Sequence, residues 1–356
     1  MTTVAYVVNT EYHLLVTASL IFEGPWSGEE VEHVIIEAGP TDGARFKGVK
    51  NRSAIGVEYQ CWNVNSLGRG LDFDLKTSVL SLLRRRIDVL VIFLEAHPLN
   101  IYLTKKLGRR GVNIILAPDG VRPYYELNFK KWAMLKSKIK KTLQTYYNLA
   151  VEGLWPNFLY IPRKGYGSLT GINALYASFP TKVKNRSNKK VIKISICQTA
   201  TTQRALCRLF DFDIDRDLPK RERIIFYVNN LLFREATYKE ELTVIFYLQK
   251  LNPGGLYIKL HPQTPLEHVK ELEDMGVKTI DDSVPAELYI ASLKNCIVIG
   301  GWSNALTLPN PQCAFYWLTE YFRASGCMYE SIRLENPCDY INEPEALEAI
   351  RFPADE

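Results

Sequence analysis

Short apolar runs alternate with amphipathic stretches along nearly the whole chain. In the first half, the runs VAYVVNT, HVIIEAG, DVLVIFL and NIILAPDG begin at residues 4, 33, 88 and 113. Each is mainly apolar and rich in Val, Ile and Leu, a pattern typical of strands that are covered on both faces. The stretches between them, such as EYHLLVTASLIF, carry apolar residues at helical spacing. This alternation predicts an α/β fold with a parallel, doubly wound sheet.

The same alternation recurs in the second half, which predicts two domains. The runs VIKISICQTA, RIIFYVNN, LYIKLHP and CIVIGG are again separated by helical patterns. A chain of 356 residues is long enough for two domains, each with its own core. Between the halves, SFPTKVKNRSNKK is polar and basic and has no apolar periodicity. We therefore predict an N-terminal domain at residues 1–180, a linker at 181–190 and a C-terminal domain at 191–356.

Composition and charge exclude several classes of protein. The chain is 47% hydrophobic and 23% charged, with a net charge of only +5, and it contains no nucleic-acid-binding motif. Its seven cysteines are scattered without CxxC spacing, which argues against a disulfide framework and a zinc site. No apolar run reaches the ~18–20 residues that span a bilayer, and MTTVAYVVNT does not read as a signal peptide. We expect a cytoplasmic protein without a bound metal or other cofactor.

Three polar clusters in the second half follow strands or lie in loops. The run LYIKLHP ends in a cation and an imidazole, VPAEL contains a carboxylate, and CIVIGGWSNAL ends in a Gly-rich turn with a hydroxyl. The residues are Lys259, His261, Pro262, Glu287, Gly301, Ser303 and Asn304. Because ligands of open parallel sheets bind beyond the carboxyl ends of the strands, we expect these side chains to converge on one site. The set suits a nucleotide with a phosphate.

The Gly-rich turn has both a functional and an ordinary interpretation. Gly300 and Gly301 allow a tight turn and close backbone approach, and Ser303 or Asn304 can cap a following helix, ALTL. Backbone N–H groups at such a helix start bind phosphate. A capped turn between strand and helix is also common in α/β proteins, and a single His261 could be structural. Because Lys259 and Glu287 are expected near the same strand ends, we favour the functional interpretation of His261 and the turn.

A basic segment, NFKKWAMLKSKIKKTLQTYY, occupies residues 128–147. Its apolar residues recur at helical spacing, which predicts a basic amphipathic helix. One interpretation is a surface helix with a solvated face. The other is a helix that docks on an anionic membrane or on a phosphorylated glycolipid acceptor.

Taken together, these motifs resemble those of the bacterial sialyltransferases of the glycosyltransferase-B (GT-B) fold, in the lipooligosaccharide sialyltransferase and polysialyltransferase groups. TEYHLLVTASLI is similar to their first strand–helix unit, and YIKLHP matches their His-Pro motif. PDGVRPYY, VPAEL and GGWSN fall where the family carries an acidic-acidic-Gly motif, a glutamate and a serine pair. The resemblance implies two Rossmann-like domains with parallel sheets that face a central cleft. This chain departs from the pattern at Pro118, which replaces the first acidic residue, and at Asn304, which replaces the second serine.

The resemblance also implies an activity. It is an inverting, metal-independent transfer of sialic acid, or a related nonulosonic acid, from a CMP-sugar to a glycan hydroxyl in lipooligosaccharide or capsule synthesis. His261 would donate a proton to the departing phosphate, and Asp119 would deprotonate the acceptor.

Binding roles are implied for the remaining residues. Lys259 and Pro262 would contact the cytosine and Glu287 the ribose hydroxyls. Gly301, Ser303 and Asn304 would surround the phosphate. On the sugar side, we expect Asn9, Thr10 and Gly120, of which Thr10 could also cap the first helix.

Alternatives remain at three levels. Glu95, at the end of the neighbouring strand DVLVIFL, competes with Asp119 as the base. The donor could be CMP-Kdo or a CDP-polyol, which enzymes of the same fold use. A protein that kept the fold but lost catalysis would instead bind a glycan or a membrane surface, an idea that Pro118 keeps open.

Overall fold

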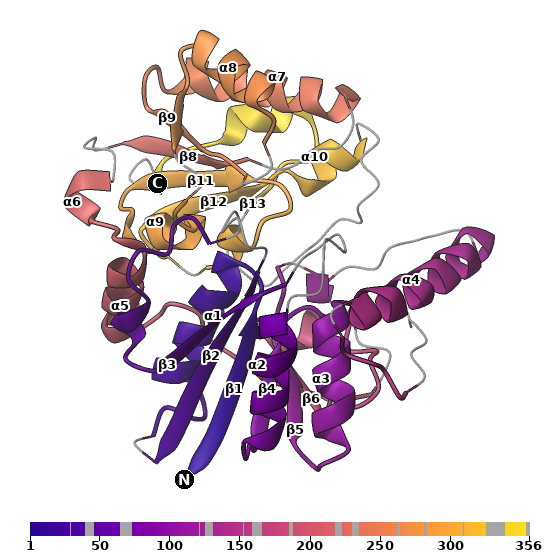
Figure 1. Cartoon of the computed structure of the whole chain (residues 1–356). Coiled ribbons are helices and arrows are strands. Elements are labelled where there is room, and N and C mark those ends of the chain that lie inside the picture. The colour runs from indigo at the N-terminus through magenta and orange to yellow at the C-terminus, as the bar shows by residue number, and fades with distance from the viewer. Residues whose placement is uncertain are drawn as a thin grey trace. The chain divides into compact units, whose positions relative to one another are not determined.

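The chain forms two units, Met1–Leu209 and Phe210–Glu356, shown in a computed structural model (Figure 1). The described residues are 1–28, 30–39, 46–64, 73–120, 122–124, 131–151, 153–158, 166–184, 188–217, 223–229, 235–261, 264–280, 283–308, 310–324 and 339–353. Within these ranges, only the backbone is described at 73–74, 131–138, 141, 214, 235–237 and 344–345.

Unit 1 is built on a parallel sheet with the strand order β3-β2-β1-β4-β5-β6-β7 in its described part. The strands are β1 (Thr2–Val8), β2 (Val31–Gly39), β3 (Glu58–Asn63), β4 (Val89–Ile92), β5 (Asn113–Leu116), β6 (Ala174–Ala177) and β7 (Lys190–Lys193). The chain runs outward from β1 in both directions, so the order reverses between β1 and β4. Loops that leave adjacent strands diverge at such a point and open a crevice at the carboxyl edge.

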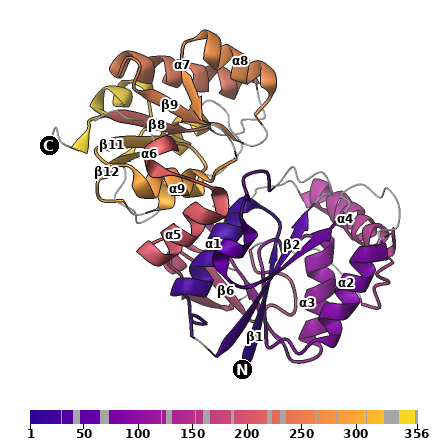
Figure 2. The same ribbon diagram turned by 60° about the vertical axis from the view of Figure 1, so that its left-hand side comes forward.

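Helices cover both faces of this sheet (Figure 2). On one face, α2 (Phe73–Arg84) and α3 (Pro98–Gly108) bury their apolar sides against the strands. On the other lie α1 (Glu11–Glu23) and α5 (Ala200–Phe210). The long helix α4 (Lys131–Val151) contacts α3. The central strands are therefore covered on both sides, which explains their largely apolar sequences.

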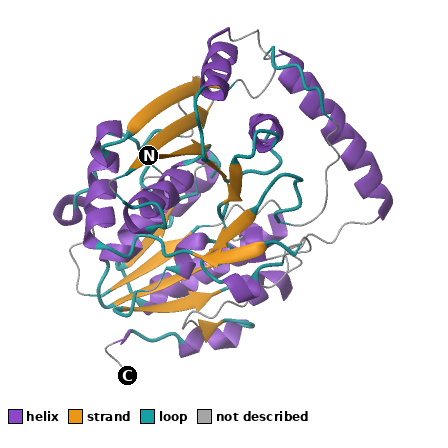
Figure 3. Ribbon diagram, turned by 90° about the horizontal axis from the view of Figure 1, so that it is seen from below, coloured by secondary structure: helices purple, strands orange, loops and turns teal. Residues whose placement is uncertain are grey.

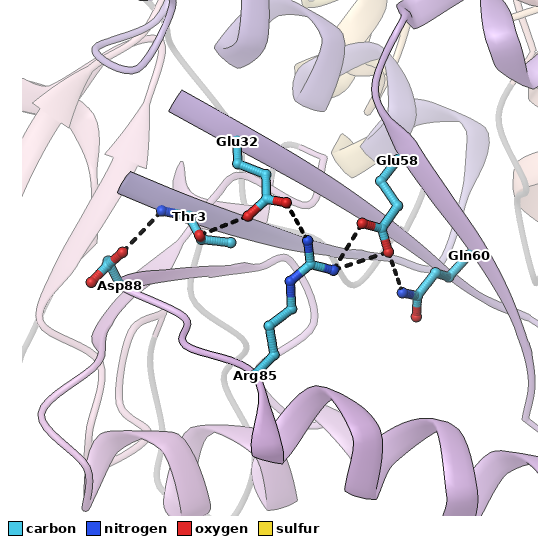
Figure 4. A network of polar contacts seen from close by, with 6 residues as sticks. All are labelled: Thr3, Glu32, Glu58, Gln60, Arg85 and Asp88. Carbon is cyan, nitrogen blue, oxygen red and sulfur yellow. Dashed lines mark hydrogen bonds and ion pairs between the residues drawn. The ribbon is translucent and has the colours of Figure 1, made fainter. Parts of the chain in front are cut away.

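A polar network ties the amino ends of the strands together (Figure 4). Arg85, just past α2, donates to Glu32 of β2 and to Glu58 of β3 at 2.5 and 2.8 Å. The Thr3 hydroxyl donates to Glu32, and the Thr3 backbone N–H donates to Asp88. These charged residues are engaged with one another at the edge opposite the carboxyl ends, so we assign them a structural role.

Unit 2 repeats the design on a second parallel sheet, with the order β10-β9-β8-β11-β12-β13 in its described part. Its strands are β8 (Ile224–Val228), β9 (Leu256–Lys259), β10 (Lys278–Ile280), β11 (Cys296–Gly300), β12 (Cys313–Trp317) and β13 (Asp339–Tyr340). The order reverses between β8 and β11, and ligands of open parallel sheets bind beyond the carboxyl ends at such a point.

Helices again lie on both faces of the second sheet, and Figure 3 shows the strands of both units among their helices. The helices α7 (Glu235–Leu251), α8 (Leu266–Asp274) and α10 (Thr319–Ala324) share one core with one face of the sheet. On the other face, α9 (Ala286–Ser292) packs its Tyr289 ring on Phe226, with the ring centroids 5.8 Å apart.

The boundary between the units differs from the predicted linker at residues 181–190. The run predicted to open the second domain forms β7, which pairs with β6 in the first sheet. The polar segment before it is thus a connection between two neighbouring parallel strands, and such a connection needs about a dozen residues whether or not it joins domains. The units divide instead after Leu209, at the end of α5.

The helix predicted after the Gly-rich turn is shorter than expected. The first three residues of ALTL lie in the 3-10 helix η4 (Asn304–Thr307), and a further 3-10 helix, η5 (Pro344–Ala349), lies near the end of the described residues. Among the described residues, no helix is both long enough and apolar enough to cross a bilayer.

Candidate functional site

The structure brings the predicted nucleotide-binding residues to the carboxyl edge of the second sheet. Lys259 is the last residue of β9, and His261 follows two residues later. Glu287 is the second residue of α9, while Gly301 follows β11 and Ser303 caps η4. Asn304 is the first residue of η4. Pro262 lies outside the described residues.

Three ionisable groups influence one another at this edge. Lys259 and Glu287 are both buried, at 4% and 7% exposure. Burial raises the pKa of Glu287 from 4.5 to about 7, although its own backbone N–H and the Lys259 charge act in the opposite direction. Burial and then the Lys259 charge lower the pKa of His261. The unit therefore keeps a cation, an acid and an imidazole close together in a poorly hydrated place, which is typical of functional sites.

Asn229, which the sequence analysis did not select, holds the His261 loop. It follows β8, and its Oδ1 accepts from the backbone N–H of His261 at 3.3 Å and from the Thr264 hydroxyl at 2.8 Å. Its Nδ2 donates at 3.1 Å to the buried carboxylate of Glu241, which also accepts from Tyr227 at 2.7 Å. The sequence feature that could have identified it is the pair of asparagines that ends RIIFYVNN. These asparagines directly follow a strand, just as His261 follows the strand in LYIKLHP.

The Gly-rich turn adjoins this loop across the switch point. Gly300 pairs with Val228 of β8, and a Cβ at Gly300 would lie 2.8 Å from the Val228 carbonyl oxygen. The glycine is therefore needed for close approach. The Ser303 hydroxyl accepts from the Ala305 N–H at 3.3 Å, which confirms the predicted cap. Since η4 is a single short turn, its dipole adds little, and the polar groups of the turn itself must carry any anion binding.

On the first sheet, the predicted sugar-side residues lie beyond the carboxyl ends of β1 and β5, the two strands that flank β4. Asn9 follows β1 and is buried, with its Nδ2 donating to the Ala38 carbonyl at 3.1 Å. Thr10 caps α1 by accepting from the His13 N–H at 3.3 Å, as predicted. Gly120 has a φ of +71°, a left-handed conformation that turns the chain away just after Asp119. Asn9 and Thr10 thus already have structural partners, while Asp119 is 35% exposed.

Asp119 is paired with a buried histidine that sequence reasoning missed. The Nε2 atom of His13 lies 3.0 Å from Asp119 Oδ1. The His13 ring is fully buried and stacks on Phe93, with 4.3 Å between ring centroids. Its other nitrogen, Nδ1, accepts from the Asn9 N–H at 3.1 Å. The signal in the sequence was one imidazole inside an apolar helix, EYHLLVTASLIF.

Glu95 lies at the same edge, three residues beyond β4. Its carboxylate accepts from the Leu169 N–H at 3.1 Å. Burial raises the pKa of Glu95, and the Leu169 N–H and the Arg122 charge lower it in part. The structure thus brings both candidate bases to the carboxyl edge of the first sheet. Only Asp119 has a histidine partner among the hydrogen bonds and ion pairs of the described residues.

The acidic run FDFDID, at residues 210–215, contains a helix-capping residue, Asp213. Asp213 Oδ1 accepts from the N–H groups of Asp215 and Arg216 at 2.8 and 3.2 Å, at the start of the short helix α6 (Ile214–Asp217). Within the described ranges, no group of three or more His, Cys, Asp and Glu side chains is arranged to hold a metal ion.

Solved structures with a similar fold include sialyltransferases. The GT-B domain of a sialyltransferase from Photobacterium damselae superposes with a TM-score of 0.51 at 13% identity, covering 96% of this chain and 100% of that one. A second structure, of a sialyltransferase from Photobacterium damsela, gives 0.52 at 12% identity over 96% of this chain and 81% of that one. S. aureus MnaA, solved with UDP, gives 0.51 at 10% identity over 98% and 83%. The GT-B fold class is confirmed.

Sequence comparison gives the family. No curated protein sequence matches the chain. The family described as alpha-2,8-polysialyltransferase matches residues 11–310, a span that contains the residues selected above at both sheet edges except Asn9 and Thr10. The chain is therefore a glycosyltransferase of the sialyltransferase type and belongs to the alpha-2,8-polysialyltransferase family.

Proposed function

We propose that the protein transfers sialic acid from CMP-sialic acid to a glycan hydroxyl, with inversion and without a metal ion. The observation that carries the proposal is the meeting of Lys259, His261 and Glu287 beside the Gly-rich turn, at the switch point of the second sheet. A cation, an imidazole and a buried acid suit a CMP moiety, which carries an anionic phosphate and two ribose hydroxyls.

Unit 2 takes the donor in this proposal. Glu287 accepts from the two vicinal ribose hydroxyls, while Lys259 and Pro262 contact the cytosine. Ser303, Asn304 and the backbone at Gly301 face the phosphate. Since the pKa of Glu287 is raised to about 7, the hydroxyl donors of the ribose also supply the hydrogen bonds that stabilise its ionised form.

His261 acts on the leaving group. As the bond between the anomeric carbon and the phosphate oxygen breaks, the electron pair goes to CMP and positive charge develops on the sugar. His261 donates a hydrogen bond, and finally a proton, to the phosphate. Burial and Lys259 lower the pKa of His261, so the negative charge of the bound phosphate must raise it again before the imidazole can serve as an acid. His261 can therefore donate its proton only when the CMP-sugar is bound.

Unit 1 supplies the base. Asp119 removes the proton from the acceptor hydroxyl, whose oxygen attacks the anomeric carbon on the face opposite CMP and so inverts the configuration. We favour Asp119 over Glu95 because its carboxylate is more open and is oriented by His13, whereas Glu95 is held by a backbone N–H. The matching experiment compares Asp119→Asn with Glu95→Gln in transfer and in CMP binding. An inactive Asp119→Asn with normal CMP affinity supports the assignment, and an active one with an inactive Glu95→Gln moves the base to Glu95.

The proposed acceptor is a surface glycolipid or capsule glycan made at the inner face of the membrane. Support comes from α4, which contains five lysines and no acidic residue. Ile139, Leu143 and Tyr147 follow one another at four-residue spacing and are 56%, 64% and 61% exposed. Basic helices with exposed apolar residues bind anionic bilayers.

A donor panel tests the whole proposal. Purified protein is incubated with CMP-sialic acid, CMP-Kdo or CDP-glycerol and an oligosialic acid acceptor, with and without EDTA. We expect transfer from CMP-sialic acid alone, unchanged by EDTA. Transfer from CMP-Kdo or CDP-glycerol would establish the alternative donors, and loss of transfer in EDTA would refute metal independence.

A further inference from the structure

The buried His13 at the start of α1 has both ring nitrogens engaged, and the partners determine its tautomer. The Asn9 backbone N–H can only donate, so His13 Nδ1 must present its lone pair at 3.1 Å. The ring proton is then on Nε2, which donates to Asp119 Oδ1 at 3.0 Å. A neutral imidazole in this tautomer satisfies both contacts at once.

From this geometry we infer that His13 is a positioning residue, which holds the Asp119 carboxylate in place and does not itself receive the acceptor proton. The inference rests on the proposed role of Asp119 as the base. A second proton on His13 could bind only at Nδ1, where it would face the Asn9 N–H with two donors head to head. The proton therefore stays on Asp119 and leaves through its exposed side.

The rest of the environment holds the imidazole in one orientation. Its ring stacks on Phe93 with an interplanar angle of 12°. Its backbone N–H is capped by Thr10. A ring fixed by packing and by two hydrogen bonds can orient a neighbouring carboxylate without paying further conformational entropy during the reaction.

Backbone geometry at Asp119 fits the same role. Pro118 restricts the chain before Asp119, and Gly120 turns it away immediately afterwards. The side chain is thus set between a rigid residue and a turn, with one carboxylate oxygen held by His13. We assign the other oxygen, Oδ2, to the acceptor hydroxyl.

Two amide substitutions separate the two contacts of His13. In His13→Gln, the side-chain N–H₂ reaches the position of Nε2 and can donate to Asp119. In His13→Asn, the shorter amide reaches the position of Nδ1 and can accept from Asn9 but cannot reach Asp119. We expect His13→Asn to lower kcat by about 10- to 100-fold and His13→Gln to stay within about fivefold of wild type, with KM for CMP-sialic acid nearly unchanged in both.

Thr17→Val is the matched control on the same helix. Thr17 is fully buried in α1, and its hydroxyl has no hydrogen-bond partner in the described part of the chain, so this change should leave kcat unaltered. All rates are expressed per folded molecule, with the folded fraction taken from titration with CMP. This correction keeps the comparison valid where a variant folds poorly.

The outcomes distinguish the inference from the proposed function. Equal kcat values for His13→Asn and wild type would overturn the positioning role, while an inactive Asp119→Asn would still leave Asp119 as the base. A His13→Gln variant as inactive as His13→Asn would also overturn it and indicate a proton relay, because an amide cannot pass on a proton. If Asp119→Asn is itself active, the proposed base fails, and this inference fails with it.

Discussion

Replacing Glu287 by Gln should stabilise the protein at alkaline pH while weakening its affinity for CMP. The carboxyl group is buried at the second position of α9, and burial raises its pKa from 4.5 to about 7. An acid with a raised pKa binds protons more tightly in the folded than in the unfolded state. Stability is therefore lost as the pH rises from about 4.5 through about 7, and glutamine, which is neutral throughout, avoids this loss.

The pKa values set the size of the effect. At 1.36 kcal/mol per pH unit, the interval from 4.5 to about 7 corresponds to about 3 kcal/mol above pH 7. At pH 5 the same linkage leaves only about 1 kcal/mol, because this pH is close to the ordinary pKa of 4.5. For a unit of this size, each kcal/mol shifts Tm by about 2–4 °C. We expect Glu287→Gln to raise Tm by about 6–12 °C at pH 8 and by at most about 4 °C at pH 5.

Glu267→Gln is a control at the equivalent position of another helix. Glu267 is exposed and is the second residue of α8, which follows Pro265 just as α9 follows Pro285. Loss of this surface carboxylate from a helix N-terminus should cost about 0.3–1 kcal/mol, with the opposite sign to Glu287→Gln. Scanning calorimetry at pH 5 and pH 8 measures both variants, and titration calorimetry measures their CMP affinity. A Glu287→Gln variant that is destabilised at pH 8, or whose Tm difference is the same at both pH values, would refute the reasoning.

Three further predictions concern the carboxyl edge of the second sheet and α4. His261→Ala should lower kcat by about 10²–10⁴-fold with CMP affinity nearly intact, as a comparison of turnover with titration calorimetry will reveal. Asn229→Ala should lower both Tm and kcat, because Glu241 loses a buried donor and the His261 N–H loses its acceptor; a normal kcat would deny Asn229 any role at the site. Replacing Ile139 and Leu143 by Ser should weaken sedimentation with anionic vesicles by about tenfold or more at low salt. If the wild-type protein does not sediment with such vesicles, α4 is a solvated surface helix and not a membrane-binding one.

The burial of an acid and a cation in unit 2 costs folding stability. Glu287 and Lys259 lose hydration on folding, and their mutual attraction offsets only part of that loss, since the pKa of Glu287 remains raised. In the proposed function, a ribose with two hydroxyl donors would restore hydrogen bonds to the carboxylate on binding. The proposed site would then gain more from its ligand than a hydrated surface pair would.

Local sequence patterns were sufficient for the strands and for most of the second-sheet site. Apolar runs mark β1, β2, β4, β5, β8, β9 and β11, because a strand that is covered on both faces is apolar at most of its positions. Parallel strands bring their carboxyl ends to one edge, so Lys259, His261 and Ser303 could be expected to lie together from their places after the strands. The Thr10 and Ser303 caps are also local and were predicted correctly.

Only the tertiary structure decided the domain boundary, the partners of the site residues and their ionisation. A polar connection looks the same in sequence whether it joins two strands of one sheet or two domains, so β7 was assigned to the wrong unit. His13 and Asp119 are 106 residues apart, and Asn229 reaches the His261 backbone across 32 residues. Contacts of this kind, and the burial that raises the pKa of Glu287, depend on how distant segments pack. The short-range periodicity of a sequence indicates which face of a helix or strand is buried. It does not indicate which distant polar group a buried side chain contacts.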